Sequence, residues 1–132
     1  MQNYEYIGCF FDKEELFRKV SHIRKNLLPN EKKHPHITFV YAPETVPTDL
    51  FGEIISVTVI GYGNDGHNEG LQVTLSTSHP VLNAMIAQIS VPHITLAVSD
   101  DGQAVNTKNI PFSPVEPFSL IGHFGGYLNE DI

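Results

Sequence analysis

Apolar and polar residues alternate over residues 4–11, which predicts a first β-strand, and the apolar spacing then lengthens to that of a helix. Asp12, followed three residues later by Glu15, has the pattern of a helix start in which side chains cap the first turn. Apolar residues then recur on one helical face at Leu16, Val20, Ile23 and Leu27. We therefore predict an amphipathic helix that reaches residue 27 and a second strand over 36–42.

The middle of the chain is predicted to form a hairpin. Residues 54–62 and 70–76 are rich in β-branched side chains, which favour strands. The segment 61–70 that joins them is rich in Gly, Asn and Asp, which tolerate the positive φ of tight turns. Its glycines also have the spacing of a dinucleotide-binding loop, but such a loop needs a helix after it to hold a pyrophosphate. Because a strand pattern follows, we interpret the segment as a hairpin turn.

The second half repeats the opening order of elements. Ser78 is placed to cap a second helix, with Pro80 in its first turn, and the apolar face of that helix comprises Leu82, Met85, Ile86 and Ile89. A strand over 93–99 follows at once. Residues 100–116 are predicted to be a long loop, and residues 118–128 a last strand.

One tetrapeptide occurs twice, each time at the start of a predicted strand that follows a helix: Pro35-His36-Ile37-Thr38 and Pro92-His93-Ile94-Thr95. Side chains two apart on a strand share a face, so each copy presents an imidazole beside a hydroxyl. The intervening isoleucines point to the other face. A repeat of the same motif in the same context indicates an internal duplication.

Two histidines are what a reaction with two proton transfers needs, because one can accept a proton while the other donates one. A single His-x-Thr on a strand is more often structural than catalytic. The second copy favours catalysis, and we expect this protein to be an enzyme.

His36-Ile-Thr-Phe39 and His93-Ile-Thr-Leu96 resemble the His-hydrophobic-Thr/Ser-hydrophobic signature of the 2H phosphoesterases, a superfamily that includes LigT-like RNA ligases and cyclic phosphodiesterases. The order of elements over most of the chain is also similar. The resemblance implies an α+β, LigT-like bilobal fold, with two pseudo-symmetric antiparallel β-sheet lobes that each carry a helix. It places the active site in the central cleft, within a single domain of residues 1–132.

The resemblance also implies roles for four residues. His36 and His93 would act as base and acid, in an order that pseudosymmetry leaves open, and the hydroxyls of Thr38 and Thr95 would bind the non-bridging phosphate oxygens. The reaction would need no metal or cofactor. Substrates in the family's range are RNA ends with a 2′,3′-cyclic phosphate, 2′-5′ oligoadenylates, and the cyclic oligonucleotide messengers that some viral members destroy.

Aromatic side chains near such a cleft could stack on a nucleobase. Five residues are candidates, although most of them are expected to be core: Tyr4, Tyr6, Phe10, Tyr41 and Tyr127.

The charge is unevenly distributed along the 132 residues. Residues 1–33 carry seven positive and five negative side chains, or +2, whereas residues 34–132 carry one positive and ten negative, or −9. A protein that follows a long phosphate backbone normally has a wide basic surface. We therefore expect a small phosphorylated ligand or a nucleic-acid end rather than duplex DNA. A solvated helix face explains the early basic residues equally well.

Other interpretations remain open at this stage. His34 and His36 could begin a zinc site, but no third ligand has a supporting spacing. The single cysteine, Cys9, lies in an apolar strand and excludes an intramolecular disulfide. A nucleotide-binding module without catalysis is the main alternative to an enzyme, and RNA-end processing is the main alternative activity. With neither a leader pattern nor a long apolar run, we expect a cytoplasmic monomer without a membrane segment.

Overall fold

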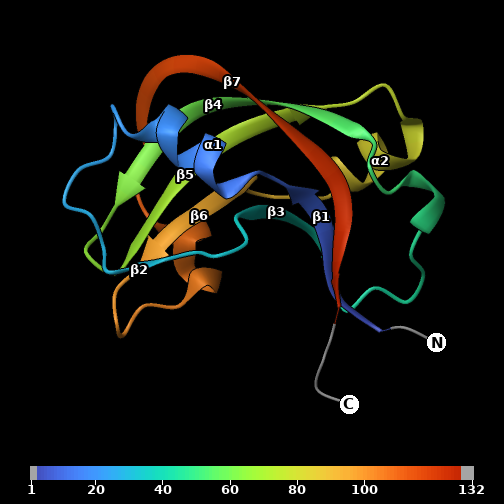
Figure 1. The fold of residues 1–132 in the computed structure, drawn as a ribbon, viewed down its shortest axis with the longest axis horizontal. Helices are drawn as coiled ribbons and strands as arrows, with labels where there is room; N and C mark the ends of the chain where they lie inside the picture. The colour runs from blue at the N-terminus through green and yellow to red at the C-terminus, as the bar shows by residue number, and fades with distance from the viewer. Residues whose placement is uncertain (1–2, 129–132) are drawn as a thin grey trace.

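The structure is a computed structural model that describes residues 3–128, and it has an α+β fold built on one antiparallel sheet (Figure 1). The elements are, in order, β1 (Tyr4–Phe10), α1 (Lys13–Val20), β2 (Asn30–Glu31), β3 (His36–Tyr41), the 3₁₀ helix η1 (Thr48–Leu50), β4 (Ile54–Asn64), β5 (Asn68–Ser76), α2 (Pro80–Ile86), β6 (His93–Val98), the 3₁₀ helix η2 (Ala104–Asn109) and β7 (Ser113–Leu128). The strand order is β2-β6-β5-β4-β7-β1-β3. This confirms the predicted α+β class.

The two halves of the sheet have matching connections. The strands β4 and β7 pair at the centre, β5 and β1 flank them, and β6 and β3 follow outside, so that β5-α2-β6 and β1-α1-β3 occupy equivalent places. We predicted a sheet in each of two lobes, whereas the pairing of β4 with β7 joins all seven strands into one. The sheet curls, and residues of β3 contact residues of β6.

The two halves also share an irregularity at the same position. Thr38 pairs with Gly8 and the next paired residue on β3 is Val40, so Phe39 is an extra residue. Thr95 pairs with Gly70 and the next is Ala97, so Leu96 is extra in the same way. A β-bulge of this kind turns the side chains that follow it to the other face. It therefore controls which later residues of β3 and β6 share a face with the histidines.

Each bulged pair requires a glycine on the partner strand. A Cβ added at Gly8 would overlap the carbonyl oxygen of Ile37, and one added at Gly70 would lie 2.8 Å from the carbonyl oxygen of Ile94. These are equivalent positions in the two halves. Only glycine permits this approach of one backbone to the next.

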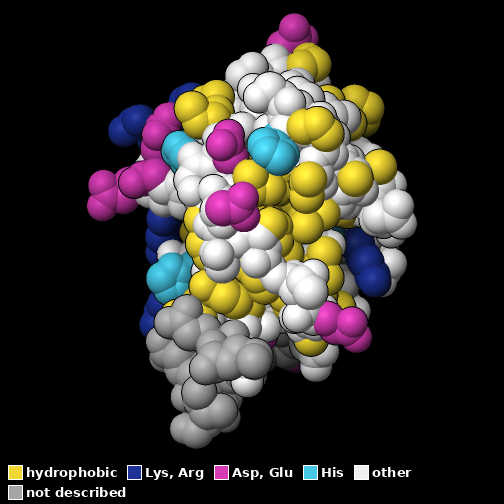
Figure 2. Space-filling view, turned by 90° about the vertical axis from the view of Figure 1, so that its right-hand side faces the viewer, with side chains coloured by type: hydrophobic (Ala, Val, Ile, Leu, Met, Phe, Trp, Pro, Cys, Tyr) yellow, Lys and Arg dark blue, Asp and Glu magenta, His cyan; other side chains and the backbone are white. Residues whose placement is uncertain are grey.

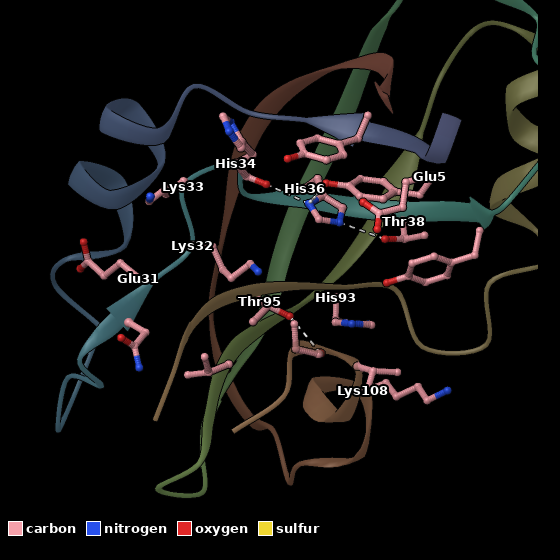
Figure 3. Close-up of a pocket in the computed structure, with 17 residues that line it drawn as sticks. Glu5, Glu31, Lys32, Lys33, His34, His36, Thr38, His93, Thr95 and Lys108 are labelled. Carbon is pink, nitrogen blue, oxygen red and sulfur yellow. Dashed lines mark hydrogen bonds between the residues drawn. The ribbon is translucent and has the colours of Figure 1, made fainter. Parts of the chain in front are cut away.

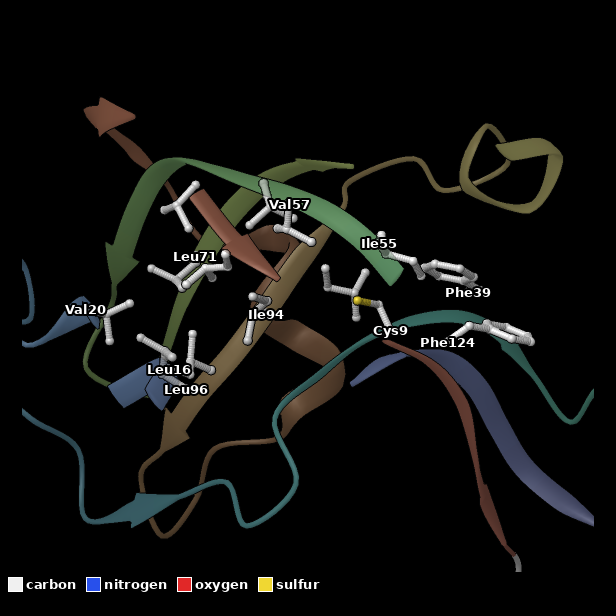
Figure 4. Packing of buried hydrophobic residues seen from close by; sticks show 14 of the residues in the cluster. Cys9, Leu16, Val20, Phe39, Ile55, Val57, Leu71, Ile94, Leu96 and Phe124 are labelled. Atoms are coloured by element: carbon white, nitrogen blue, oxygen red, sulfur yellow. The ribbon is translucent and has the colours of Figure 1, made fainter. Parts of the chain in front are cut away.

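The core lies on the face of the sheet opposite the two histidines (Figure 4). Ile37 and Ile94, which alternate with the histidines and threonines, are both fully buried. Both helices contribute to the same cluster, through Leu16, Val20 and Leu82. Burial of each large apolar side chain stabilises the fold by roughly 1.5–3 kcal/mol, so the period-2 pattern fixes which face of β3 and β6 remains outside the core.

The first helix is shorter than predicted. Asp12 does cap it, since its carboxylate accepts a hydrogen bond from the amide of Glu15 at 2.9 Å, but the helix ends at Val20. Residues that a longer helix would include are bound elsewhere: the amide of Lys25 donates to the Tyr62 hydroxyl at 3.0 Å, and Asn26 has φ of 55°. Leu27, predicted to be in the helix, is 64% exposed.

Three other predictions of local structure need correction. The second helix is capped at His79 rather than Ser78, and Ile89 lies beyond its end. The predicted loop 100–116 contains η2 and the first residues of β7, and the two-residue strand β2 was not foreseen. The hairpin between β4 and β5 is confirmed, with Gly66 at φ of 89°. Within residues 3–128, no helix has the length and apolar character needed to cross a membrane.

Candidate active site

A cleft of about 580 Å³ lies between β3 and β6, and it contains both histidines and both threonines of the repeated motif (Figure 3). The segment 30–34 and the 3₁₀ helix η2 complete its walls. The sequence predicted four residues on two strands. The structure brings them together, because the sheet curls until β3 and β6 approach.

The imidazole of His36 is held in one tautomer. Its Nδ1 lies 2.8 Å from the carbonyl oxygen of His34, and a carbonyl can only accept, so Nδ1 carries the proton and donates it. The other nitrogen, Nε2, then has a free electron pair and accepts from the Thr38 hydroxyl at 3.0 Å. Nε2 is therefore the atom of His36 that can exchange a proton with a ligand.

The imidazole of His93 is held in the same way. Its Nδ1 donates to the carbonyl oxygen of Val91 at 2.7 Å, again the residue two positions earlier. In both copies of the motif, proline occupies the position between that carbonyl and the histidine. Proline restricts the residue before it to extended conformations, which fixes the geometry of this contact. The two histidines thus share one tautomer, in which Nδ1 carries the proton and Nε2 does not.

Aromatic rings hold His36 from the side. The Tyr6 ring stacks on the imidazole with centroids 4.2 Å apart, and Phe10 lies at 5.6 Å with a small angle between the planes. Tyr127 continues the stack on the far side of Tyr6 at 5.2 Å. Stacking against two rings restricts rotation of the His36 side chain.

The two threonines differ. The Thr38 hydroxyl contacts its own histidine, whereas the Thr95 hydroxyl donates to the Thr107 hydroxyl on η2 at 2.8 Å. Thr107 is fully buried and also accepts from the side-chain amide of Asn68 at 2.9 Å. The 3₁₀ helix η2 therefore breaks the equivalence of the two halves at this point.

Both histidines are neutral at neutral pH in the free protein. The pKa of His36 is lowered from 6.5 to about 4, mainly by burial and to a smaller extent by the positive charge of Lys32 and by the other imidazoles of the cleft, while the hydrogen bond to the His34 carbonyl opposes the shift. Burial also lowers the pKa of His93, with an added effect from the positive charge of Lys108. An anion bound between them would favour the protonated form and so raise both pKa values.

The early basic residues do not form one surface. Lys32 and Lys33 line the cleft, where Lys108 joins them, but Arg24 is used in ion pairs with Glu31 and Glu69. Of the other early basic residues, Lys13, Arg18 and Lys19 lie on α1, and Lys25 lies beyond the end of that helix, where Tyr62 and Asn64 bind its backbone. In the view of Figure 2, Lys and Arg side chains gather toward the edges and the centre is largely apolar.

The five aromatic candidates separate into two groups. Tyr6, Tyr41 and Tyr127 line the cleft, whereas Phe10 packs behind His36 and Tyr4 packs edge-on against Phe51 at 5.6 Å. Sequence reasoning missed the cleft-lining residues Glu5, Val105 and Lys108. The last two lie in η2, which had been predicted to be loop, and nothing in the sequence marked Glu5.

No group of three His, Cys, Asp or Glu side chains in residues 3–128 is arranged to hold a metal ion. His34, considered above as a zinc ligand together with His36, binds His36 through its backbone carbonyl rather than through its side chain. No protein-family model and no curated protein matches this sequence.

Proposed function

We propose that this protein is a metal-independent phosphodiesterase that acts on cyclic nucleotides or small, including cyclic, oligonucleotides by two-histidine acid–base catalysis. The observation that carries the proposal is the pair of equivalent imidazoles in one cleft, each with Nδ1 bound to a backbone carbonyl and with a threonine hydroxyl two residues away. The proposal agrees with the resemblance to the 2H phosphoesterases. On the same grounds we propose a LigT-like, bilobal arrangement in which β1, β3 and β7 form one lobe and β4, β5 and β6 the other.

The proton transfers balance for a 2′,3′-cyclic phosphate. One neutral imidazole accepts a proton from water as the water oxygen bonds to phosphorus. The bond from phosphorus to one ribose oxygen breaks, and the other imidazole, protonated in the complex, donates its proton to that oxygen. For a 3′-5′ linkage, the base would instead accept the 2′-hydroxyl proton and the acid would protonate the 5′ oxygen. Threonine hydroxyls and the lysines stabilise charge on the non-bridging oxygens.

Activity is expected to have a bell-shaped pH dependence that lies lower for kcat/KM than for kcat. The profile of kcat/KM reflects the free protein, where both histidine pKa values are below 6.5, with His36 at about 4. The bound phosphate raises these values, which moves the kcat profile to higher pH. A kcat/KM profile whose limbs both lie above pH 7 would contradict this account.

Unfolding must be measured over the same pH range. Between about 6.5 and about 4 the unfolded chain binds a proton at His36 that the folded protein does not, so stability falls as the pH falls through this range. Circular dichroism at each pH separates loss of fold from titration of the site.

A substrate panel tests the proposed function directly. We expect hydrolysis of mononucleotide 2′,3′-cyclic phosphates or cyclic di- and trinucleotides to exceed that of a tRNA with a cyclic end, because residues 34–132 carry a charge of −9 and repel an extended backbone. The panel includes 2′-5′ oligoadenylate, and kcat/KM is compared. If the tRNA is the best substrate, RNA-end processing replaces the small-ligand proposal.

Two controls separate the remaining alternatives. Activity should survive excess EDTA, and loss on chelation with rescue by zinc would favour a metal site that includes His34 and His36. Binding of the panel without any turnover would instead indicate a nucleotide-binding module.

A further inference from the structure

Phosphate binding gives no role to the carboxylate of Glu5 in the cleft. Glu5 lines the cleft together with three lysines, and Figure 3 shows its side chain directed into the cavity on the side of Thr38. Within residues 3–128, the Glu5 carboxylate has no hydrogen-bond or ion-pair partner. It is also not among the groups that shift the pKa of His36. A free carboxylate repels phosphate, so its presence calls for a different part of the ligand.

The fold places Glu5 in the cleft through a local irregularity. On β1, Tyr4 pairs with Leu128 and Tyr6 pairs with Tyr127, so Glu5 is an extra residue opposite two consecutive residues of β7. Regular alternation would place Glu5 on the face opposite Tyr6, toward the core. The irregularity directs it to the cleft instead.

A second irregularity places Tyr41 beside it. Regular alternation from His36 and Thr38 would put Tyr41 on the core face, but the bulge at Phe39 turns it to the cleft, opposite Tyr6. Tyr41 is 62% exposed. The next residue, Ala42, has φ of 46° and donates its amide to the carbonyl of Glu5 at 2.9 Å. This contact ties the end of β3 to Glu5.

The equivalent end of the other half has different chemistry. By the matched pairing, the counterpart of Tyr41 is Val98 and that of Tyr6 is Asn68, whose side-chain amide donates to the carbonyl of Gln103 and to Thr107. Only the Tyr41 end thus combines an exposed aromatic face with a free acceptor. A ligand whose phosphate lies between the histidines would therefore contact different chemical groups at the Tyr41 end of the cleft and at the Val98 end.

We propose that Tyr41 and Glu5 form a nucleobase subsite that selects a guanine-type base. The Tyr41 ring would stack on the base, and the two carboxylate oxygens would accept from the adjacent ring N–H and exocyclic amino group that guanine presents together. Adenine and cytosine offer an amino group without the neighbouring N–H. Uracil offers one N–H between two carbonyls that a carboxylate repels. This inference rests on the proposed function only in placing phosphate at the histidines.

Equilibrium binding to the full chain tests the subsite without requiring turnover. The ligands are the 5′-monophosphates of guanosine, inosine, adenosine and uridine, with ribose 5-phosphate as the base-free reference. Guanosine monophosphate is expected to bind at least about tenfold more tightly than the uridine compound, with inosine between them. Glu5→Gln should reduce the ratio of the guanosine monophosphate affinity to the uridine monophosphate affinity about tenfold. Tyr41→Leu should reduce the affinity of every ligand that carries a base, relative to the affinity of ribose 5-phosphate.

Glu44→Gln is the matched control, since it removes the same charge from an exposed position that does not line the cleft. It should leave both ratios unchanged. The subsite is wrong if the wild-type protein does not prefer guanosine to uridine monophosphate, or if Glu5→Gln changes the affinity of all five ligands by one factor. Base selectivity with no hydrolysis of any phosphodiester would support the subsite and refute the proposed activity. Hydrolysis that is indifferent to the base would do the reverse.

Discussion

Replacing either His36 or His93 with alanine is expected to lower kcat at least about a hundredfold, because each change removes one of the two proton-transfer partners. The fold should survive, since neither imidazole belongs to the apolar core. The double variant should be little worse than either single one, because the two groups act in the same step. Steady-state kinetics on the best substrate of the panel, with circular dichroism of each variant, checks this result.

The matched control is His67→Ala, which removes a histidine whose side chain is outside the cleft and 61% exposed. Thr38→Ala should lower kcat less than either histidine change does. It should lower kcat more than Thr95→Ala, because of the two threonines only Thr38 contacts a histidine directly. Near-native turnover by a purified His36→Ala or His93→Ala variant would exclude the two-histidine mechanism.

The four motif residues could be found from sequence because the information is local. Alternation along a strand places His36 beside Thr38 and His93 beside Thr95, and the apolar residues between them determine which face is buried. Even the tautomer follows from a contact only two residues away. A pattern that is complete within one tetrapeptide does not depend on contacts with distant parts of the chain.

The rest of the site depends on contacts between distant segments. The bulge at Phe39 is visible only in the register of β3 against β1, and it reverses the face on which Tyr41 would be expected. Lys108 reaches the cleft because Thr107, beside it on η2, is bound by Thr95 and Asn68. Neither the register nor that hydrogen-bond network leaves a periodic signal in the sequence.

The predicted helix failed beyond Val20 for a similar reason. Its apolar spacing is real, but Arg24 lies within the stretch and its guanidinium binds Glu69, 45 residues away, with both contacts at 2.7 Å. Tyr62 and Asn64 bind the backbone at Lys25 from the same distant hairpin. Tertiary contacts of charged and polar groups therefore override a helical pattern that is favourable but weak.

Glu69→Ala is expected to destabilise the protein by about 3–5 kcal/mol, because it leaves the Arg24 guanidinium buried without its main partner. Glu69 is fully buried and the Arg24 side chain is 6% exposed. The Glu69 carboxylate also accepts from the Tyr62 hydroxyl at 2.7 Å. Urea unfolding of wild type and variant measures the difference. The matched control is Glu15→Ala, which breaks the exposed Lys19–Glu15 pair and should cost about 1 kcal/mol or less.

A double variant distinguishes loss of the ion pair from loss of packing. Arg24→Met with Glu69→Leu removes both charges, so it should recover most of the stability that Glu69→Ala loses. A Glu69→Ala variant no less stable than Glu15→Ala would contradict a stabilising role for the buried Arg24–Glu69 pair.

The same ion pairs also reach the wall of the cleft, because Arg24 binds Glu31 at 2.7 Å and Glu31 precedes Lys32 in that wall. If the network positions that wall, the double variant should bind phosphate ligands more weakly than wild type even where it is equally stable, whereas Glu15→Ala should bind them normally.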